Sequence, residues 1–221
     1  MTTTTVLAGL VLLILLAERA VVLLLTRTQE GCAWVARHRS LHPNTISLVR
    51  IPMGLVSMGL WSLGGLWQHA ALLWFAFWMI TDLTDGTLAR RCDLITPSGK
   101  WLDPLSDKCM YFPPLLLFAF AYGQPLDWHW IVPLVLLDAG GQASRLFVKK
   151  KAANLFGKAK TALITTLLTL TALRALGGIP FVTDSFLQLL TISATLLAFL
   201  SFYCKIVPDA WYANTLTLAN F

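Results

Sequence analysis

Apolar residues fill the chain in long runs that polar and charged residues interrupt at nearly regular intervals. A helix that crosses a bilayer needs about 20 mostly apolar residues. The first run covers 6–26 and contains Glu18 and Arg19. Six further runs follow, at about 45–64, 70–90, 99–122, 129–149, 157–176 and 184–204. The pattern predicts an all-α integral membrane protein, with a six-helix transmembrane core and an additional N-terminal hydrophobic helix.

The same pattern divides the chain into three parts. We assign 1–40 to the N-terminal hydrophobic helix and its juxtamembrane segment, 41–205 to a transmembrane domain and 206–221 to a C-terminal tail. The first helix either spans the membrane or lies in the interface between lipid and water. Charged residues inside an apolar segment are costly, so Glu18 and Arg19 mark either a contact with another helix or an interfacial bend.

The composition agrees with a bilayer as the main solvent. Hydrophobic residues make up 57% of the chain and charged residues 13%, whereas soluble domains carry about 25% charged residues. The net charge of +6 would suit a nucleic-acid partner in a soluble protein, but here Lys and Arg gather in alternate connections between the apolar runs. The positive-inside rule places those connections in the cytoplasm. We therefore expect a multi-pass membrane protein with no nucleic-acid partner.

Location and redox state follow from further features of the chain. We expect a bacterial inner membrane, because the chain lacks an Arg-rich and Ser-rich transit segment. None of the cysteines forms a C-x2-C pair, and the predicted topology places all of them toward the reducing cytoplasmic side. We expect four free thiols: Cys32, Cys92, Cys109 and Cys204.

Five of the eleven acidic residues fall within 26 positions, and four of them lie on the apolar runs: Asp82, Asp85, Asp103 and Asp107. The first two are three residues apart and the last two are four apart, so each pair shares one face of a helix. Carboxylates near a membrane usually face a partner or a cavity. Neighbouring Lys and Arg residues are one kind of partner, but four acids on two matched faces favour a bound divalent metal.

The segment TDLTDGTLARRCDLITPSGKWLDPLSDK joins these acids to small residues at fixed spacing. It contains the pattern D-x2-D-G-x2-A-R-x8-G-x3-D-x3-D, which runs from Asp82 to Asp107. This pattern resembles the signature of the CDP-alcohol phosphotransferase family, whose members are also called CDP-alcohol phosphatidyltransferases. The six predicted core helices extend the resemblance over about 40–205. Within the family, the segment is most like the phosphatidylglycerophosphate synthase and CMP-forming cardiolipin synthase branches.

The resemblance implies a metal-dependent enzyme of phospholipid biosynthesis. Such an enzyme transfers a phosphatidyl group from CDP-diacylglycerol to an alcohol acceptor and releases CMP. The resemblance places two divalent cations, Mg²⁺ or Mn²⁺, among the four Asp residues, and makes Asp107 the general base for the acceptor hydroxyl. It assigns five residues to the nucleotide pocket: Gly86, Ala89, Arg90, Gly99 and Asn44. Asn44 has an equal interpretation as a helix N-cap. Arg50 is expected to be a buried structural partner or a cation that snorkels to the membrane surface, rather than a ligand-binding residue.

The acceptor site is the least determined part of the prediction. Our first choice is glycerol-3-phosphate, and the expected cations for its phosphate are Arg145, Lys158 and Lys160. The chain has Leu137–Gly141 where glycerophosphate-using members would carry an Arg-Glu pair, so other acceptors stay open. They are phosphatidylglycerol, as in a CMP-forming cardiolipin synthase, and inositol or inositol phosphate. Asp138 either orients a hydroxyl, pairs with Arg145, or belongs to a polar network without a catalytic part.

Two further points stay open from the sequence. A divalent-cation transporter is the alternative from another functional class, but transporters usually repeat their polar helix breaks in two halves. Here the four acids lie beside a single cytoplasmic connection. Members of the family are often dimers, and the apolar faces of this chain leave room for a homodimer.

Overall fold

The structure is a computed structural model that describes residues 3–121, 126–144, 155–177 and 181–206. All regular secondary structure in these residues is helical, which confirms the all-α prediction. The chain forms two compact units. The first contains the chain up to Pro114 and a short piece that begins at Ala175; the second contains most of the remainder.

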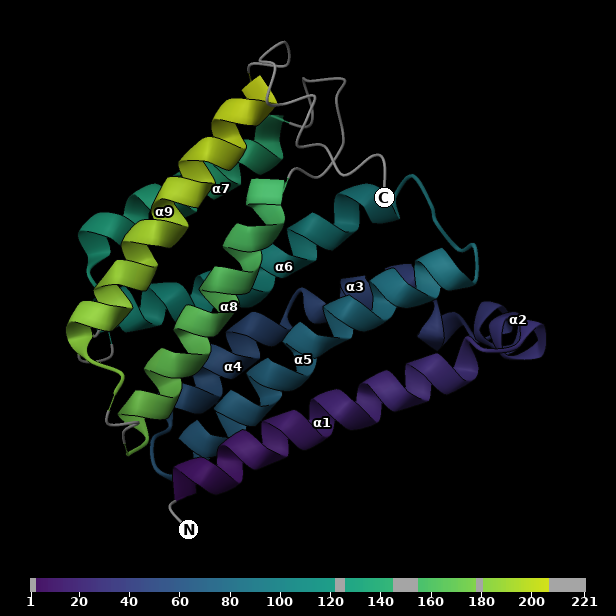
Figure 1. Ribbon diagram of the computed structural model, residues 1–221, viewed down its shortest axis with the longest axis horizontal. Coiled ribbons are helices and arrows are strands. Elements are labelled where there is room, and N and C mark those ends of the chain that lie inside the picture. The colour runs from purple at the N-terminus through teal and green to yellow at the C-terminus, as the bar shows by residue number, and fades with distance from the viewer. Residues whose placement is uncertain (1–2, 122–125, 145–154, 178–180, 207–221) are drawn as a thin grey trace. The chain divides into compact units, whose positions relative to one another are not determined.

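The first unit is built from six helices of the described residues (Figure 1). They are α1 (Thr3–Leu25), α2 (Gln29–Arg37), α3 (Pro43–Arg50), α4 (Met53–Ser62), α5 (Leu66–Arg91) and α6 (Gly99–Leu116). A single 3₁₀ turn, Arg39–Leu41, connects α2 to α3. Pro43 stands in the first turn of α3, where a missing N–H costs nothing, and the His42 side chain accepts the N–H of Asn44.

A tight turn reverses the chain between α4 and α5. Gly64 and Gly65 take φ values of +75° and +55°, in the left-handed region that glycine enters without a steric penalty. The two helices then pack against each other along their length. On the neighbouring side, a Cβ on Gly54 of α4 would lie 2.2 Å from the carbonyl oxygen of Cys109 in α6. Glycine at this position therefore lets α4 approach the backbone of α6 directly.

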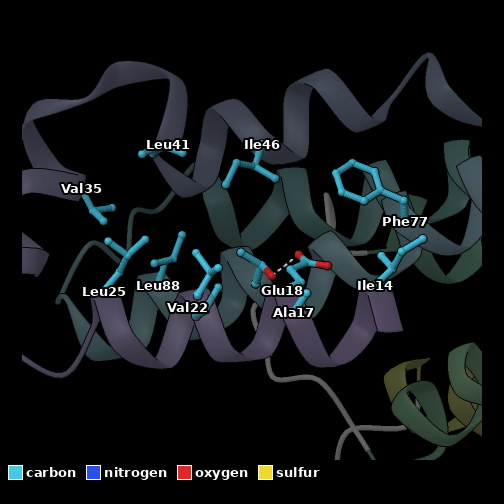
Figure 2. A pocket seen from close by; sticks show the side chains of 12 residues that line it. Ile14, Ala17, Glu18, Val22, Leu25, Val35, Leu41, Ile46, Phe77 and Leu88 are labelled. Atoms are coloured by element: carbon cyan, nitrogen blue, oxygen red, sulfur yellow. Dashed lines mark hydrogen bonds between the residues drawn. The ribbon is translucent and has the colours of Figure 1, made fainter. Parts of the chain in front are cut away.

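The N-terminal helix α1 runs beside α5 (Figure 1). Val22 of α1, Val35 of α2 and Leu88 of α5 form a buried apolar cluster. Next to this cluster is a cavity of about 400 Å³ between α1 and the helices around it, with almost entirely apolar walls (Figure 2). Glu18, on α1, is one of the few polar side chains that line it. The charged pair at Glu18 and Arg19 thus marks a helix contact, as one of the two sequence interpretations predicted.

The second unit continues from α6 with a π-helical turn, Leu117–Ala121, and contains α7 (Trp128–Ala143), α8 (Leu155–Ala175) and α9 (Asp184–Ile206). Helices α7 and α9 pack side by side. The Thr195 hydroxyl of α9 donates to the carbonyl oxygen of Trp130 in α7 at 3.2 Å. Fully buried apolar residues such as Ile131, Leu134 and Leu187 form the interior of this unit.

The six apolar runs of the core correspond to helical segments: α3 with α4, α5, α6 with its π-helical turn, α7, α8 and α9. Among the described helices, Pro43–Ser62 and Asp184–Ile206 are long and apolar enough to cross a membrane. Gly9–Leu25 and Gln29–Arg37 make a third candidate if the two helices, which meet at 106°, are taken as one broken span. Helical segments are therefore confirmed, and six crossings remain a proposal.

The expectation of four free thiols is wrong in this structure. Cys32 of α2 and Cys92, at the end of α5, form a disulfide with a Cα–Cα distance of 5.1 Å. Cys109 and Cys204 are free. Sixty positions separate the two bonded cysteines, and only the folding of α2 back onto the end of α5 brings them together.

Candidate active site

The second half of α5 has two different faces. One carries acids and small residues: Asp82, Asp85, Gly86 and Ala89. The opposite face carries Thr84, Thr87 and Leu88. This division follows from the 100° step between successive residues of an α-helix. In α6, Asp103 and Asp107 are one turn apart, so they share a face as the sequence predicted.

The guanidinium of Arg50 joins three of the four acids. Its Nη1 donates to Asp82 Oδ1 at 2.7 Å and to Asp107 Oδ1 at 2.8 Å. Its Nη2 donates to Asp85. The Arg50 side chain is 0% exposed, whereas Asp82 keeps 32% of its side chain exposed. Arg50, at the end of α3, is thus the buried partner that the sequence predicted, and it links α3 to both acid-bearing helices.

Ser47 connects the remaining acid to this cluster. Its hydroxyl lies 2.9 Å from Asp85 Oδ2 and 2.9 Å from Asp103 Oδ1. A hydroxyl has one proton to donate, so Ser47 can satisfy only one of the two carboxylates at a time. Ser47 and Arg50 are three residues apart on α3 and therefore face the same side. All four predicted acids gather around this face of α3, and we call this group (Ser47, Arg50 and the four Asp) the acid cluster.

Two predicted nucleotide residues lie beside the cluster on α5. A Cβ on Gly86 would lie 3.5 Å from Nη1 of Arg90, so the guanidinium of Arg90 extends over Gly86. Arg90 is exposed and Ala89 is half-buried. The guanidinium lies above Gly86, which is one turn beyond Asp82, and is placed where it could meet a phosphate.

Asn44 and Gly99 contact each other directly. The Asn44 Nδ2 donates to the Thr96 hydroxyl at 2.9 Å, and that hydroxyl also lies 3.0 Å from Asn44 Oδ1. A Cβ on Gly99 would lie 2.8 Å from Asn44 Oδ1, so the space above Gly99 holds the Asn44 amide. The N-cap interpretation of Asn44 is wrong, because His42 caps α3. Asn44 instead fastens the start of α3 to the start of α6.

The predicted acceptor cations belong to the second unit or lie outside the described residues. Lys160 of α8 forms an ion pair with Asp138 of α7, and their side chains are 5% and 1% exposed. The structure thus gives Asp138 a lysine partner, which sequence reasoning did not identify. Lys158 is exposed. Arg145 lies outside the described residues.

The acid cluster fits divalent cations in its donor chemistry. No three Asp, Glu, His or Cys side chains among the described residues form a ready ligand set, and the guanidinium of Arg50 contacts both Asp82 and Asp107. Four carboxylates around one guanidinium carry surplus negative charge, and Mg²⁺ and Mn²⁺ prefer such hard oxygen donors.

Comparison with known protein families identifies the family of this chain. Residues 40–202 match the family described as CDP-alcohol phosphatidyltransferase. The chain belongs to this family. CDP-alcohol phosphatidyltransferases are membrane-embedded and generally use divalent cations. The matched region contains the whole acid cluster and excludes α1 and α2.

Individual relatives are similar over shorter stretches. A protein of Pseudomonas fluorescens is 39% identical over 83 residues, which are 37% of this chain and 43% of that protein. One of Bacillus subtilis is 32% identical over 96 residues, 42% of this chain and 49% of that protein. A chloroplast and mitochondrial protein of Arabidopsis thaliana is 34% identical over 108 residues, 41% of this chain and 36% of that protein.

All three relatives are named CDP-diacylglycerol–glycerol-3-phosphate 3-phosphatidyltransferase. The chain matches less than half of the length of each. No solved structure matches the chain.

Sequence reasoning missed Ser47 and the central position of Arg50. A signal was present, because a serine and an arginine one turn apart on an otherwise apolar segment share a face. Their partners lie 32 to 57 positions away, so that signal could identify the face of α3 but not what it meets.

Proposed function

We propose that this chain transfers a phosphatidyl group from CDP-diacylglycerol to glycerol-3-phosphate, which gives phosphatidylglycerophosphate and CMP. One observation carries the proposal: three of the four motif carboxylates contact one buried guanidinium, and the neighbouring Ser47 contacts the fourth. The names of the relatives support glycerol-3-phosphate as the acceptor. The cytoplasmic side of a bacterial inner membrane is the proposed location, with 1–40, 41–205 and 206–221 as the parts of the chain.

Different residues of the acid cluster would bind the cations, orient the carboxylates and transfer the proton. Asp82, Asp85, Asp103 and Asp107 would hold two divalent cations, which when bound supply positive charge for the pyrophosphate and the leaving group. Arg50 contacts Asp82, Asp85 and Asp107 from inside the protein and fixes their orientation. Because Asp82 keeps 32% and Asp107 18% of the side chain exposed, both carboxylates can be reached by a ligand.

Asp107 is the proposed general base. It accepts the proton of the acceptor hydroxyl while that oxygen bonds to the phosphorus that carries the diacylglycerol group. The bond from this phosphorus to the oxygen of CMP breaks, and CMP leaves with the bridging oxygen. Gly86 and Ala89 leave room for the nucleotide, and Arg90 meets its phosphates. Asn44 and Gly99 shape the same pocket where α3 and α6 begin.

Arg145, Lys158 and Lys160 are the proposed cations for the acceptor phosphate. Lys158 is exposed and can bind a phosphate directly. Lys160 would first have to leave Asp138, because the two form a buried ion pair. A homodimer in the bilayer is part of the same proposal.

The test is to identify the lipid product. Purified protein in detergent receives CDP-diacylglycerol, Mg²⁺ and one labelled acceptor per reaction: glycerol-3-phosphate, phosphatidylglycerol, inositol, inositol phosphate or serine. We expect label in the lipid extract, with equimolar CMP, only with glycerol-3-phosphate. Label from phosphatidylglycerol alone would show the cardiolipin synthase alternative. No product with any acceptor would contradict the proposal and favour the cation-transporter alternative.

A further inference from the structure

The N-terminal helix α1 lies outside the matched family region, which begins at residue 40, yet it contacts the helix that carries Asp82 and Asp85. The contact is on the face of α5 turned away from the acids, where Thr84, Thr87 and Leu88 lie. Thr84 occupies the turn between the two aspartates. A movement of α1 that shifts Thr84 therefore shifts both carboxylates.

The Thr84 hydroxyl both accepts and donates a hydrogen bond in this contact. It accepts a hydrogen bond from Arg19 Nη2 at 2.7 Å and donates its proton to Glu18. The other terminal nitrogen of Arg19 donates to the Thr87 hydroxyl at 3.3 Å. Glu18 and Arg19 thus both bond to the Thr84 hydroxyl. These bonds fix the rotation of α5, and its position along the helix axis, relative to α1.

The apolar surroundings of this polar contact raise the free-energy cost of burying its charged groups. Glu18 Oε2 and Arg19 Nε are buried and lack a hydrogen-bond partner within the described residues. The adjoining cavity, of about 400 Å³, has mostly apolar walls, and Figure 2 shows Glu18 among the apolar side chains that line it. Apolar side chains could join two helices here at least as stably as buried charged groups. A charged contact in this position therefore points to a requirement for a specific geometry.

Two further attachments hold the N-terminal segment to the same side of α5. Val22 packs against Leu88, one turn beyond Thr84. The disulfide between Cys32 and Cys92 lies one further turn along, at the end of α5. Positions 84, 88 and 92 are spaced by four and share a face. The N-terminal segment thus forms a brace along two turns of α5, behind the acids.

We propose that Glu18 and Arg19 are positioning residues that act through Thr84 to set the placement of Asp82 and Asp85 relative to Asp103 and Asp107. The inference rests on the proposed function, because it assigns a role to the distance between acids that would share bound cations. Residues that orient metal ligands typically change metal affinity or activity by about 10–100-fold when they are mutated. An effect of this size is expected even though neither residue touches the substrate.

The test compares Thr84→Val with Thr84→Ser in the purified full-length chain. Valine keeps the shape of threonine and removes the hydroxyl, whereas serine keeps the hydroxyl. Mn²⁺ affinity is measured without substrate from the signal of free Mn²⁺ in electron paramagnetic resonance, together with the midpoint temperature of unfolding. We expect Thr84→Val to weaken Mn²⁺ binding about tenfold or more and to raise the Mg²⁺ requirement for CMP release in parallel. Thr84→Ser should stay close to the wild type.

Val22→Ala is the matched control for packing alone. It removes apolar contact between α1 and α5 and leaves the polar contact in place, so we expect a lower unfolding midpoint with unchanged Mn²⁺ affinity. The inference is overturned if Thr84→Val keeps the wild-type affinity, or if Val22→Ala weakens Mn²⁺ binding equally. Should Thr84→Val fail to fold, Glu18→Gln is judged by the same measurements and the same criteria.

The two proposals fail in different ways. A wild-type chain that binds Mn²⁺ and responds to Thr84→Val, but releases no CMP with any acceptor, would contradict the proposed function and support the positioning role. A wild-type chain that releases CMP and whose Mn²⁺ affinity ignores Thr84→Val would contradict the positioning role alone.

Discussion

The two units of the molecule each bury charged side chains, but they do so differently. In the first unit, Arg50 is completely buried, while its partners Asp82 and Asp107 keep 32% and 18% of their side chains exposed. In the second unit, Asp138 and Lys160 are 1% and 5% exposed. In the first group, Arg50 and Asp85 are buried while Asp82 and Asp107 are partly exposed. In the second group, both members of the pair are buried.

This difference separates a site that can take a ligand from a contact that joins helices. Open carboxylates held from behind by one guanidinium can accept further positive charge from outside. A closed ion pair must break before either member binds anything else, and breaking a buried pair is strongly destabilising. The comparison therefore favours cation binding at the acid cluster, whereas Lys160 can meet an acceptor phosphate only after it leaves Asp138.

The largest expected effect follows from removing the proposed base. Asp107→Asn keeps the size of the side chain and its contact with Arg50, but it removes the proton acceptor. We expect the kcat for CMP release to fall about 10²–10⁴-fold, which is the usual contribution of a general base. Glu30→Gln is the matched control, because Glu30 is an exposed acid of α2 that is not part of the acid cluster. Normal turnover by purified Asp107→Asn would contradict the assignment.

Removal of the central cation should mainly affect stability. Arg50→Met leaves Asp82, Asp85 and Asp107 together without their buried partner. Breaking a buried ion pair on one side costs about 3–5 kcal/mol, and we expect a loss of this size in the free energy of unfolding in detergent. Arg50→Lys retains the charge and should recover part of it. An unchanged unfolding free energy in Arg50→Met would show that the acids do not depend on Arg50.

Lys160, which is buried in an ion pair, and Lys158, which is exposed, allow the two kinds of lysine on α8 to be compared. We expect Lys160→Met to lower the unfolding free energy by about 3 kcal/mol or more. Adding Asp138→Leu to the same chain should restore much of that loss. If Lys160→Met has the unfolding free energy of the wild type, and Lys160→Met/Asp138→Leu is no more stable than Lys160→Met, the buried pair does not contribute to stability as proposed.

Lys158→Ala should leave stability unchanged and raise the KM for glycerol-3-phosphate about tenfold, as expected for a lost hydrogen bond to a charged group.

The smallest expected effect concerns the disulfide in the first unit, since the cysteine described in the second unit is free. Cys32 and Cys92 are bonded beside the acid-bearing helix, whereas Cys204 in the second unit is free. Thiol titration of the unfolded protein should count two thiols without a reductant and four after reduction. Four thiols in unreduced protein, purified with its thiols protected from exchange, would remove the covalent part of the brace and leave its polar and apolar contacts.

Much of the acid cluster could be predicted from the sequence, because its information is local. Asp82 with Asp85 and Asp103 with Asp107 are one turn apart, so helical periodicity alone places each pair on one face. Arg50 could be expected to be buried, since a single cation in an apolar helix needs partners. Which acids it meets could not be predicted, because that depends on how α3 packs against α5 and α6.

The errors have the same origin. The disulfide was missed because the spacing of Cys32 and Cys92 has no motif and their approach depends on the fold of α2. The ion pair of Lys160 with Asp138, 22 positions away, could not be predicted, because it depends on how α7 and α8 pack. Glu18 and Arg19 could be identified as a contact, but Thr84, 65 or more positions further on, could not be named as their partner.

Equilibrium binding of Mn²⁺ to the purified chain tests the central claim most directly, because it probes the acids without any substrate. We predict that the wild type binds about two Mn²⁺ ions per chain, the number expected of a two-metal site. The double variant Asp82→Asn/Asp85→Asn, with an unfolding midpoint that shows it is folded, should lose this binding. The same isotherm for both proteins would contradict the claim that the acid cluster is a divalent-cation site.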